Sequence, residues 1–303
     1  MNYTLNNHLK YYIDDRLYGF RETPYEKFTV DVGSVDKAYY KTSSWLKEQY
    51  RTADIISKEY GKEFALMFSG GTDSEIVLRS FLHIGVTPKI FFVKFSNGYN
   101  HQDYLEALEV TNSLGVKLEV LDFDVVDFFN SGQASEFSIE LQCRQIAYLT
   151  IYHHIKKLQL PSIMGGEMLF QRKVNLEGSR WYYSIRENQD ASAIRLSIKY
   201  NIPLVNEWFS YTPEMMLYYL EHSKIQWLLN ERYNYKMASF STKNEVLREY
   251  MPDLFDRVKT HGFEHLLGFN NEAYYKLNKG YHKRLESSLD GIYVDDLEKK
   301  LRG

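Results

Sequence analysis

The residues best suited to chemistry form a short polar run, SGGTDS, at positions 69–74. Its two glycines let the backbone approach an anion, and N–H groups of the loop and of a following helix would point at that anion. Asp73 would repel a bare phosphate, so we expect its carboxylate to hold Mg²⁺ between itself and the phosphates. A plain glycine-rich turn capped by Asp73 is the alternative. The predicted binding residues are Ser69, Gly70, Gly71, Thr72, Asp73 and Ser74.

The elements around this run must form a parallel sheet. Residues 64–68 (FALMF) are continuously apolar, which is typical of a strand buried on both faces, and a helix is expected over 73–83. A second apolar run at 90–95 completes a βαβ unit. The polar run then lies at the carboxyl end of the first strand, where α/β folds bind ligands. No GxxxxGK[ST] motif is present, which excludes a Walker A site.

The remaining pattern extends this α/β reading. Strands are expected at 116–121 and 162–166, and helices over 42–60, 102–114 and 141–158. We therefore predict an α/β fold with a doubly wound parallel sheet, a mostly helical C-terminal part and a small N-terminal extension. Short strands are expected in the extension, with a hairpin turning near Gly33-Ser34. The charged tail from Gly280 is expected to be peripheral.

Composition limits the class of protein. The 303 residues carry a net charge of −3, which argues against a chain built mainly to grip nucleic acid. Cys143 is the one cysteine, so an intrachain disulfide and a CxxC zinc site are excluded. The sequence shows no signal-peptide pattern and no long apolar stretch, so a cytoplasmic protein without a membrane segment is expected. Aromatic residues reach 16%, through either biased composition or stacking platforms for a base.

SGGTDS resembles the SGGxDS PP-loop of the N-type ATP pyrophosphatases, which include asparagine synthetases, GMP and NAD synthetases, tRNA-lysidine synthetases and 7-cyano-7-deazaguanine synthases. The resemblance implies a PP-loop fold of the adenine nucleotide alpha hydrolase type. It also implies that ATP, with Mg²⁺, is cleaved between its α- and β-phosphates while a substrate oxygen is adenylated. Main chain at Met67-Phe68 and Val93-Lys94 would bind adenine. On this basis we expect an N-terminal extension at 1–44, an ATP-binding domain at 45–230 and a helical segment at 231–303 that completes the active site.

Three later segments resemble the synthetase domain of asparagine and β-lactam synthetases. IMGGE (163–167) resembles the strand-to-loop SGE motif, which implies that Gly165, Gly166 and Glu167 lie beside the adenylate. Residues 241–254 resemble the helix before the catalytic lysine, and Arg257-x-Lys259 with Gly262-Phe263 resembles the R-x-K…GF stretch. Lys259 would then stabilise the departing pyrophosphate, and Glu167 would position the amine or take its proton. Arg144 either contacts ATP or is a solvated helix arginine.

The departures from that family are informative. Phe170 stands where the family has a second acidic metal ligand, and Asn2 stands where its glutaminase domain has a catalytic cysteine. The predicted function is an AMP-forming ligase acting on a small-molecule acid and an amine or ammonia, with a possible separate ammonia-supplying partner. One alternative is activation of a nucleobase, as in the deazaguanine or lysidine branches. The other is a nucleotide-binding protein that has lost catalysis. The oligomeric state is left open.

Overall fold

A parallel sheet organises the structure, a computed structural model that describes residues 8–23, 25–61, 63–143, 145–166, 168, 170–175, 178–186, 191–230, 240–255, 262–263 and 289–303. The sheet has five parallel strands in the order β10-β7-β4-β5-β6. Their bounds are β4 (Ala65–Met67), β5 (Lys89–Phe95), β6 (Leu118–Phe123), β7 (Ser162–Ile163) and β10 (Leu204–Val205). The predicted α/β fold with a parallel sheet is confirmed.

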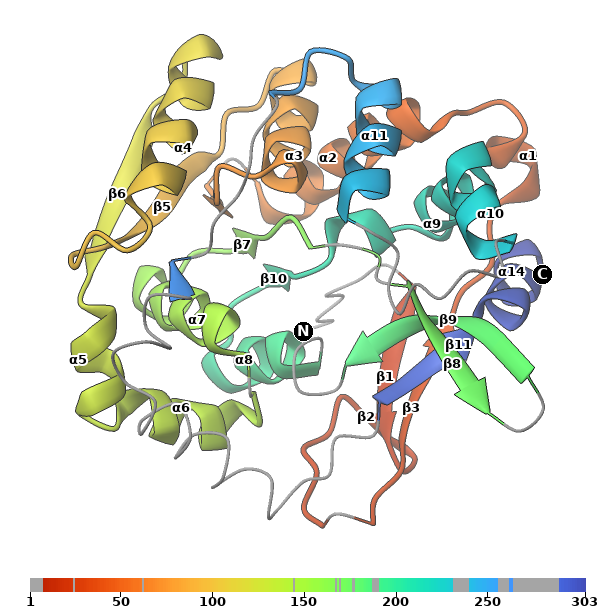
Figure 1. Ribbon diagram of the computed structural model, residues 1–303, viewed down its shortest axis with the longest axis horizontal. Coiled ribbons are helices and arrows are strands. Elements are labelled where there is room, and N and C mark those ends of the chain that lie inside the picture. The colour runs from red at the N-terminus through yellow and green to blue at the C-terminus, as the bar shows by residue number, and fades with distance from the viewer. Residues whose placement is uncertain are drawn as a thin grey trace.

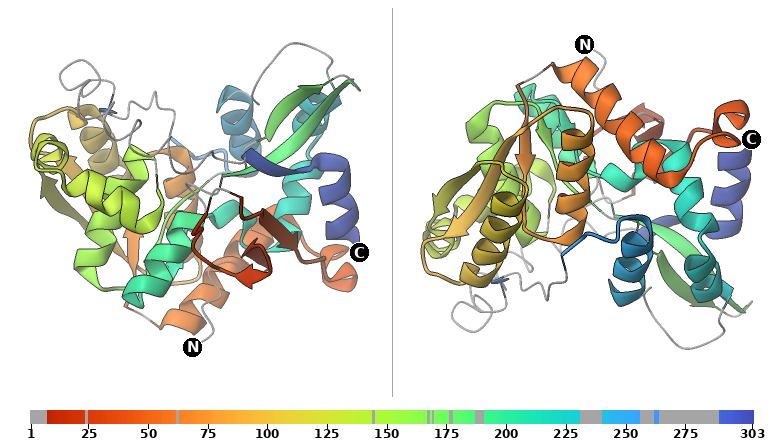
Figure 2. Two further views of the ribbon diagram at one scale, coloured as in Figure 1. Left: turned by 90° about the horizontal axis from the view of Figure 1, so that it is seen from below. Right: turned by 90° about the horizontal axis from the view of Figure 1, so that it is seen from above.

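Helices cover both faces of this sheet. The helices α2 (Trp45–Tyr60), α3 (Thr72–His83) and α4 (His101–Ser113) lie on one side (Figures 1 and 2). On the other side lie α6 (Gln133–Leu141), α7 (Ile146–Leu158) and α8 (Ser192–Tyr200), while α5 (Val125–Asn130) lies beyond the end of β6. Fully buried side chains such as Leu66, Ile76 and Ile163 fill the layers between sheet and helices. This burial explains why the strand sequences are continuously apolar.

The strand order creates a switch point between β4 and β7. From β4 the chain steps to β5 and then to β6, but β7 returns to the opposite side of β4, and β10 follows beyond it. The connections that leave β4 and β7 therefore run to opposite sides of this pair of strands. In open α/β sheets a ligand crevice forms at such a point, outside the carboxyl ends of the strands. The polar run at 69–74 and the glycines at 165–166 follow these two strands.

The N-terminal region forms its own antiparallel sheet, with the order β2-β1-β3. Its strands are β1 (Leu9–Ile13), β2 (Arg16–Leu17) and β3 (Phe28–Val32), and α1 (Lys37–Tyr40) follows. The expected hairpin near Gly33-Ser34 is wrong, because β1 pairs with β3 through Leu9↔Val32 and Ile13↔Phe28. The chain therefore turns between residues 14 and 27, and Gly33 comes after the last strand.

Two further segments differ from the expected pattern. The helix expected over 141–158 begins later, at Ile146 as α7, because α6 ends at Leu141 and Gln142 adopts a left-handed conformation (φ 51°). After residue 170, β8 (Phe170–Asn175) and β9 (Gly178–Arg186) form a hairpin that the sequence reading missed. The strand β11 (Leu289–Tyr293) joins it in the order β11-β9-β8.

Beyond the hairpin the described residues are mostly helical, as expected for the C-terminal part. After α8 the helices there are η2 (Trp208–Ser210), α9 (Pro213–Glu221), α10 (Ser223–Asn230), α11 (Phe240–Tyr250) and α14 (Val294–Arg302). Thr212 caps α9 by accepting a hydrogen bond from Met215 N at 3.2 Å, with Pro213 at the first helical position. The tail is not peripheral, because Leu297 and Leu301 of α14 are fully buried. No helix in the described part of the chain combines the length and apolar character needed to cross a membrane.

We expect stability to fall as the pH drops from about 6.5 towards 4. Burial lowers the pKa of His8 and of His154 from 6.5 to about 4. The unfolded chain takes up these protons near pH 6.5 and the folded chain only near pH 4, so acid favours unfolding throughout this window. The loss is on the order of 1–2 kcal/mol for each histidine at about pH 5 relative to about pH 7.

Urea denaturation at about pH 5 and about pH 7 measures this loss of stability. His154→Phe is the informative variant, because the ring contacts Phe123 edge-on at 4.8 Å between centroids and its Nε2 makes no hydrogen bond with the described residues. The variant should reduce the pH dependence while keeping the ring contact. An unfolding free energy that is equal at the two pH values would contradict these pKa shifts.

Candidate functional site

The polar loop connects β4 directly to α3. Phe68 N donates to Phe91 O at 2.8 Å and so extends the ladder between β4 and β5 by one residue before the loop begins. The Ser74 hydroxyl donates to Gly71 O at 2.9 Å, and the hydroxyls of Ser69 and Ser74 lie 3.3 Å apart. Gly71 is the N-cap of α3 and offers no side chain to the first turn. The N–H groups of that turn are therefore suited to an anion.

Glycine is required at two positions around this loop because other backbone comes very close. Gly70 has φ +71°, and a Cβ on it would lie 3.0 Å from Asp103 O and 3.2 Å from the Cβ of Ala107. A Cβ on Gly165 would lie 3.1 Å from the Cβ of Asp73 and 3.2 Å from Ser74 N. The loop is thus held between the start of α4 and the chain that leaves β7. This arrangement brings the predicted Gly165 into contact with the predicted Asp73.

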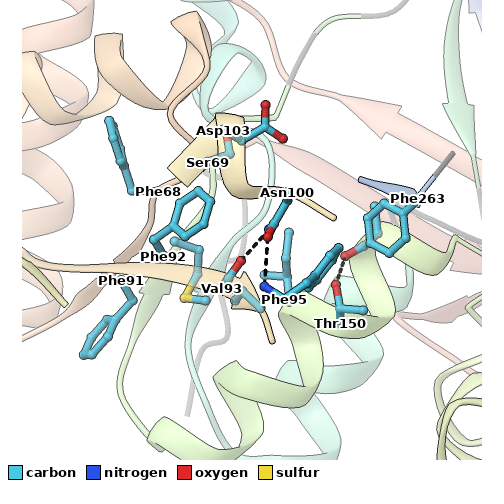
Figure 3. A pocket seen from close by; sticks show the side chains of 13 residues that line it. Phe68, Ser69, Phe91, Phe92, Val93, Phe95, Asn100, Asp103, Thr150 and Phe263 are labelled. Carbon is cyan, nitrogen blue, oxygen red and sulfur yellow. Dashed lines mark hydrogen bonds between the residues drawn. The ribbon is translucent and has the colours of Figure 1, made fainter. Parts of the chain in front are cut away.

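A pocket adjoins the loop at the carboxyl ends of β4 and β5. Its empty space is about 570 Å³, including the part open to solvent. Figure 3 shows Ser69 and Asp103 toward one end of the pocket and Phe263 toward the other. The lining is mostly apolar and aromatic: Met67, Phe68, Ser69, Phe91, Phe92, Val93, Phe95, Asn100, Asp103, Ala147, Thr150, Ile151 and Phe263.

Asn100 fixes the end of β5 where this strand borders the pocket. Its Oδ1 accepts from Phe95 N and its Nδ2 donates to Val93 O, both at 2.8 Å (Figure 3). The side chain thus continues the edge of β5 beyond the point where β4 ends. Asn100 is 6% exposed, so these bonds are shielded from water. The main chain of Val93 is held in place as one wall of the pocket.

The segment Gly262-Phe263 closes the pocket from a distant part of the chain. A Cβ on Gly262, which has φ +71°, would lie 2.9 Å from Tyr99 O and 3.0 Å from Asn100 N. This close approach requires glycine. Phe263 then contacts Phe95 edge-on, with 5.2 Å between ring centroids. The GF part of the R-x-K…GF stretch therefore lies at the pocket.

The structure brings together most of the predicted site that it describes. Phe68, Ser69 and Val93 line one pocket, and Gly165 lies against Asp73 and Ser74, while Gly166 lies against Asn206 and Glu207. Lys94 is not among the residues that line the pocket, and its Nζ lies over the ring of Tyr104, 4.8 Å from the centroid. Arg144, Glu167 and Lys259 lie outside the described residues, and their roles stay predictions.

Sequence reasoning missed Asn100, Asp103 and the wall that α7 provides through Ala147, Thr150 and Ile151. The residues of α7 are small or apolar and carry no chemical signature. Asn100 had a usable signal, because it follows shortly after a strand that ends at the ligand-binding edge of the sheet.

The residues at the loop fit a magnesium ion shared with phosphates. Among the described residues no group of three or more histidine, cysteine, aspartate or glutamate side chains is arranged to hold a metal by itself. Mg²⁺ commonly binds through one or two carboxylates while phosphates and waters complete its shell. Asp73, at the start of α3 and beside the narrow gap left by Gly165, is the carboxylate that suits this role.

These features define an α/β domain with a loop suited to an anion at the switch point of its sheet. No family model and no curated protein matches the chain. Among solved structures it is similar to a predicted subunit of tRNA methyltransferase from Methanocaldococcus jannaschii, at 15% identity and a TM-score of 0.37, over 77% of this chain and 96% of that one. It is also similar to NMN synthetase from Francisella tularensis, at 12% identity and a TM-score of 0.31, over 79% and 96% respectively.

Proposed function

We propose that this chain is an ATP-dependent, AMP-forming ligase that adenylates a substrate carboxylate and transfers the acyl group to ammonia or an amine. One observation carries the proposal: an aromatic pocket, the loop at 69–74 and the glycines at 165–166 follow one another along the carboxyl edge of the sheet. ATP needs these three parts: a pocket for its base, donors for its β- and γ-phosphates, and an approach for the acid to its α-phosphate. The likeness of SGGTDS and IMGGE to synthetase motifs supports the same assignment.

The base of ATP would occupy the pocket beside Val93. The aromatic walls favour a flat ring, and Val93 lies where main-chain hydrogen bonds can distinguish one base from another. The Thr150 hydroxyl donates to Ala147 O at 2.8 Å, so towards the base it can act as an acceptor only. Phe263 would then contact the base on the side opposite the strands.

The triphosphate would extend from Ser69 over the loop. The N–H groups at the start of α3 and the hydroxyls of Ser69 and Ser74 would bind the β- and γ-phosphates, which leave as pyrophosphate. These donors are fixed before the reaction, so they stabilise the developing charge without reorganising. Magnesium held by Asp73 would neutralise part of the phosphate charge when bound.

The acid would approach from the side of Gly165 and Gly166. Both glycines pack against neighbouring chain, so the carboxylate would pass along their main chain to reach the α-phosphorus in line with the leaving pyrophosphate. Lys259 is proposed to stabilise the negative charge on that leaving group. Gly262-Phe263, a few residues further along the sequence, lies at the pocket. Glu167, next to Gly166 in sequence, is proposed to position the amine.

ATP–pyrophosphate exchange across a panel of carboxylic acids tests this function. Exchange should depend on one acid or one class of acids, because reversible adenylation requires the acid to be present. Exchange that requires a nucleobase or a tRNA would favour the alternative substrate class. ATP binding without exchange under any condition would contradict the proposed chemistry.

Filling the pocket with a larger side chain should weaken nucleotide binding. Ile151 is half-buried and lines the pocket, so Ile151→Trp should weaken ATP binding by at least ~10-fold, because the indole takes the volume of the base. Leu105→Trp on α4 is the matched control, since Leu105 is 45% exposed and lies outside the pocket. Calorimetric titration with a non-hydrolysable ATP analogue measures both. Equal affinity in the two variants would show that the base binds elsewhere.

A further inference from the structure

A second polar cluster lies one strand beyond the proposed phosphate site. Gly166 has φ +63°, and a Cβ on it would lie only 2.6 Å from Asn206 O and from the Cα of Glu207. Gly165 contacts Asp73 in the same close manner, and Gly165 O accepts from Trp208 N at 3.0 Å. Backbone contacts therefore run without a break from Asp73 to Glu207, at the carboxyl end of β10.

Glu207 is a nearly buried carboxylate held by neutral donors. It is 6% exposed, and its Oε2 accepts hydrogen bonds from the hydroxyls of Tyr183 and Ser210, each at 2.9 Å. Within the described residues both hydroxyls bind Oε2 and leave Oε1 for another partner. A carboxylate removed from water is costly unless a cation or further hydrogen bonds compensate it.

The described surroundings of Glu207 do not supply that cation. The nearest histidine, His8, donates from Nε2 to Ser210 O at 2.9 Å and is neutral near pH 7, because burial lowers its pKa to about 4. No lysine or arginine whose side chain the structure describes forms an ion pair with Glu207. Asn206, the preceding residue, is bonded through Oδ1 to the Tyr152 hydroxyl at 3.1 Å and carries no charge. A positively charged ligand would complete the cluster.

We propose that Glu207 binds the nitrogen nucleophile of the reaction as a protonated primary amine or an ammonium ion. This inference rests on the proposed function, because that reaction needs an amine close to the acyl adenylate. An ammonium group offers several N–H donors and a full charge to Oε1, while Tyr183 and Ser210 hold Oε2. The position fits, because the backbone of Glu207 lies against Gly166, which borders the proposed adenylate.

The chemistry at this position balances. The bound ammonium gives one proton to Glu207, and the freed lone pair forms a C–N bond with the acyl carbon. The C–O bond to AMP breaks, and AMP leaves with that electron pair. A second proton passes from the nitrogen to water, and the product is the amide. Glu207 is then a catalytic residue for the second half-reaction.

Glu207→Gln tests the assignment, because it removes the charge and keeps the size. With the acid found by pyrophosphate exchange, amide formation is titrated with ammonium chloride and with primary alkylamines. The half-saturating amine concentration should rise by about 30–100-fold, and this rise should exceed any change in exchange by at least ~10-fold. Glu22→Gln, at an exposed ion pair with Arg16, is the control and should match the wild type.

Each outcome decides between the two proposals. If the wild type exchanges pyrophosphate and Glu207→Gln titrates with amine like the wild type, the amine site is wrong and the ligase survives. If the wild type exchanges with no acid, the proposed function fails and the inference fails with it. Should Glu207→Gln not fold, Tyr183→Phe replaces it, because losing one hydrogen bond to Oε2 should raise the half-saturating amine concentration by about 3–10-fold. A Tyr183→Phe titration equal to that of the wild type would overturn the assignment.

Discussion

Asp73→Asn is expected to reduce ATP–pyrophosphate exchange by at least ~10²-fold, the loss typical of removing a group that stabilises phosphoryl charge. Asparagine keeps the size of the side chain but loses the charge that would hold magnesium. Asp73 lies in the first turn of α3 and against Gly165, so the position tolerates only a side chain of the same size. Because asparagine has that size, the variant should fold normally. It should need a higher magnesium concentration for half-maximal exchange.

A matched control separates this effect from a general change in charge. Asp122 is exposed on β6, two strands away from β4, so Asp122→Asn removes the same charge outside the loop. Its exchange rate should equal that of the wild type. Exchange by Asp73→Asn within about threefold of the wild type would remove Asp73 from the site.

Gly166→Ala is expected to cost at least ~3 kcal/mol of folding free energy, or to prevent folding. The left-handed backbone at φ +63° costs about 1–2 kcal/mol with a side chain. The larger cost comes from contact, because the new Cβ would meet Asn206 O and the Cα of Glu207 at 2.6 Å. These are backbone atoms, which can move only if the junction of β7 and β10 moves.

Gly85→Ala isolates the conformational part of that cost. Gly85 has φ +74°, but a Cβ on it would meet no atom within 4 Å, so its substitution should cost only about 1–2 kcal/mol. Urea denaturation of both variants measures the difference. If Gly85→Ala folds and Gly166→Ala does not, the larger cost expected at Gly166 is also supported. Equal losses in the two variants would contradict the close approach at Gly166.

The part of the site that could be predicted from sequence is the part with strong local patterns. The run FALMF, the loop SGGTDS and the helix to His83 lie next to one another, so β4, the loop and α3 follow from local signals. The glycines after β7 could be placed by likeness to a known motif. Their contact with Asp73 is then a consequence of the parallel order of β4 and β7.

The parts that sequence reasoning missed have weak or distant causes. The strand β10 has only two residues, too few for any periodicity, although it carries Asn206 and Glu207 at its end. The helix expected over 141–158 shows no obvious break, because Gln142 is an ordinary residue held in a left-handed conformation. The pairing of β9 with β11 joins residues more than 100 apart and leaves no local signal, whereas the β8–β9 hairpin is local.

The products of ATP turnover test the central claim most directly. Phosphorus NMR of the protein with ATP, magnesium, the active acid and ammonium chloride distinguishes cleavage at the α-phosphate from cleavage at the γ-phosphate. An acyl-adenylating ligase must release AMP and pyrophosphate in equal amounts. Formation of ADP and inorganic phosphate instead would contradict the PP-loop chemistry proposed for residues 69–74.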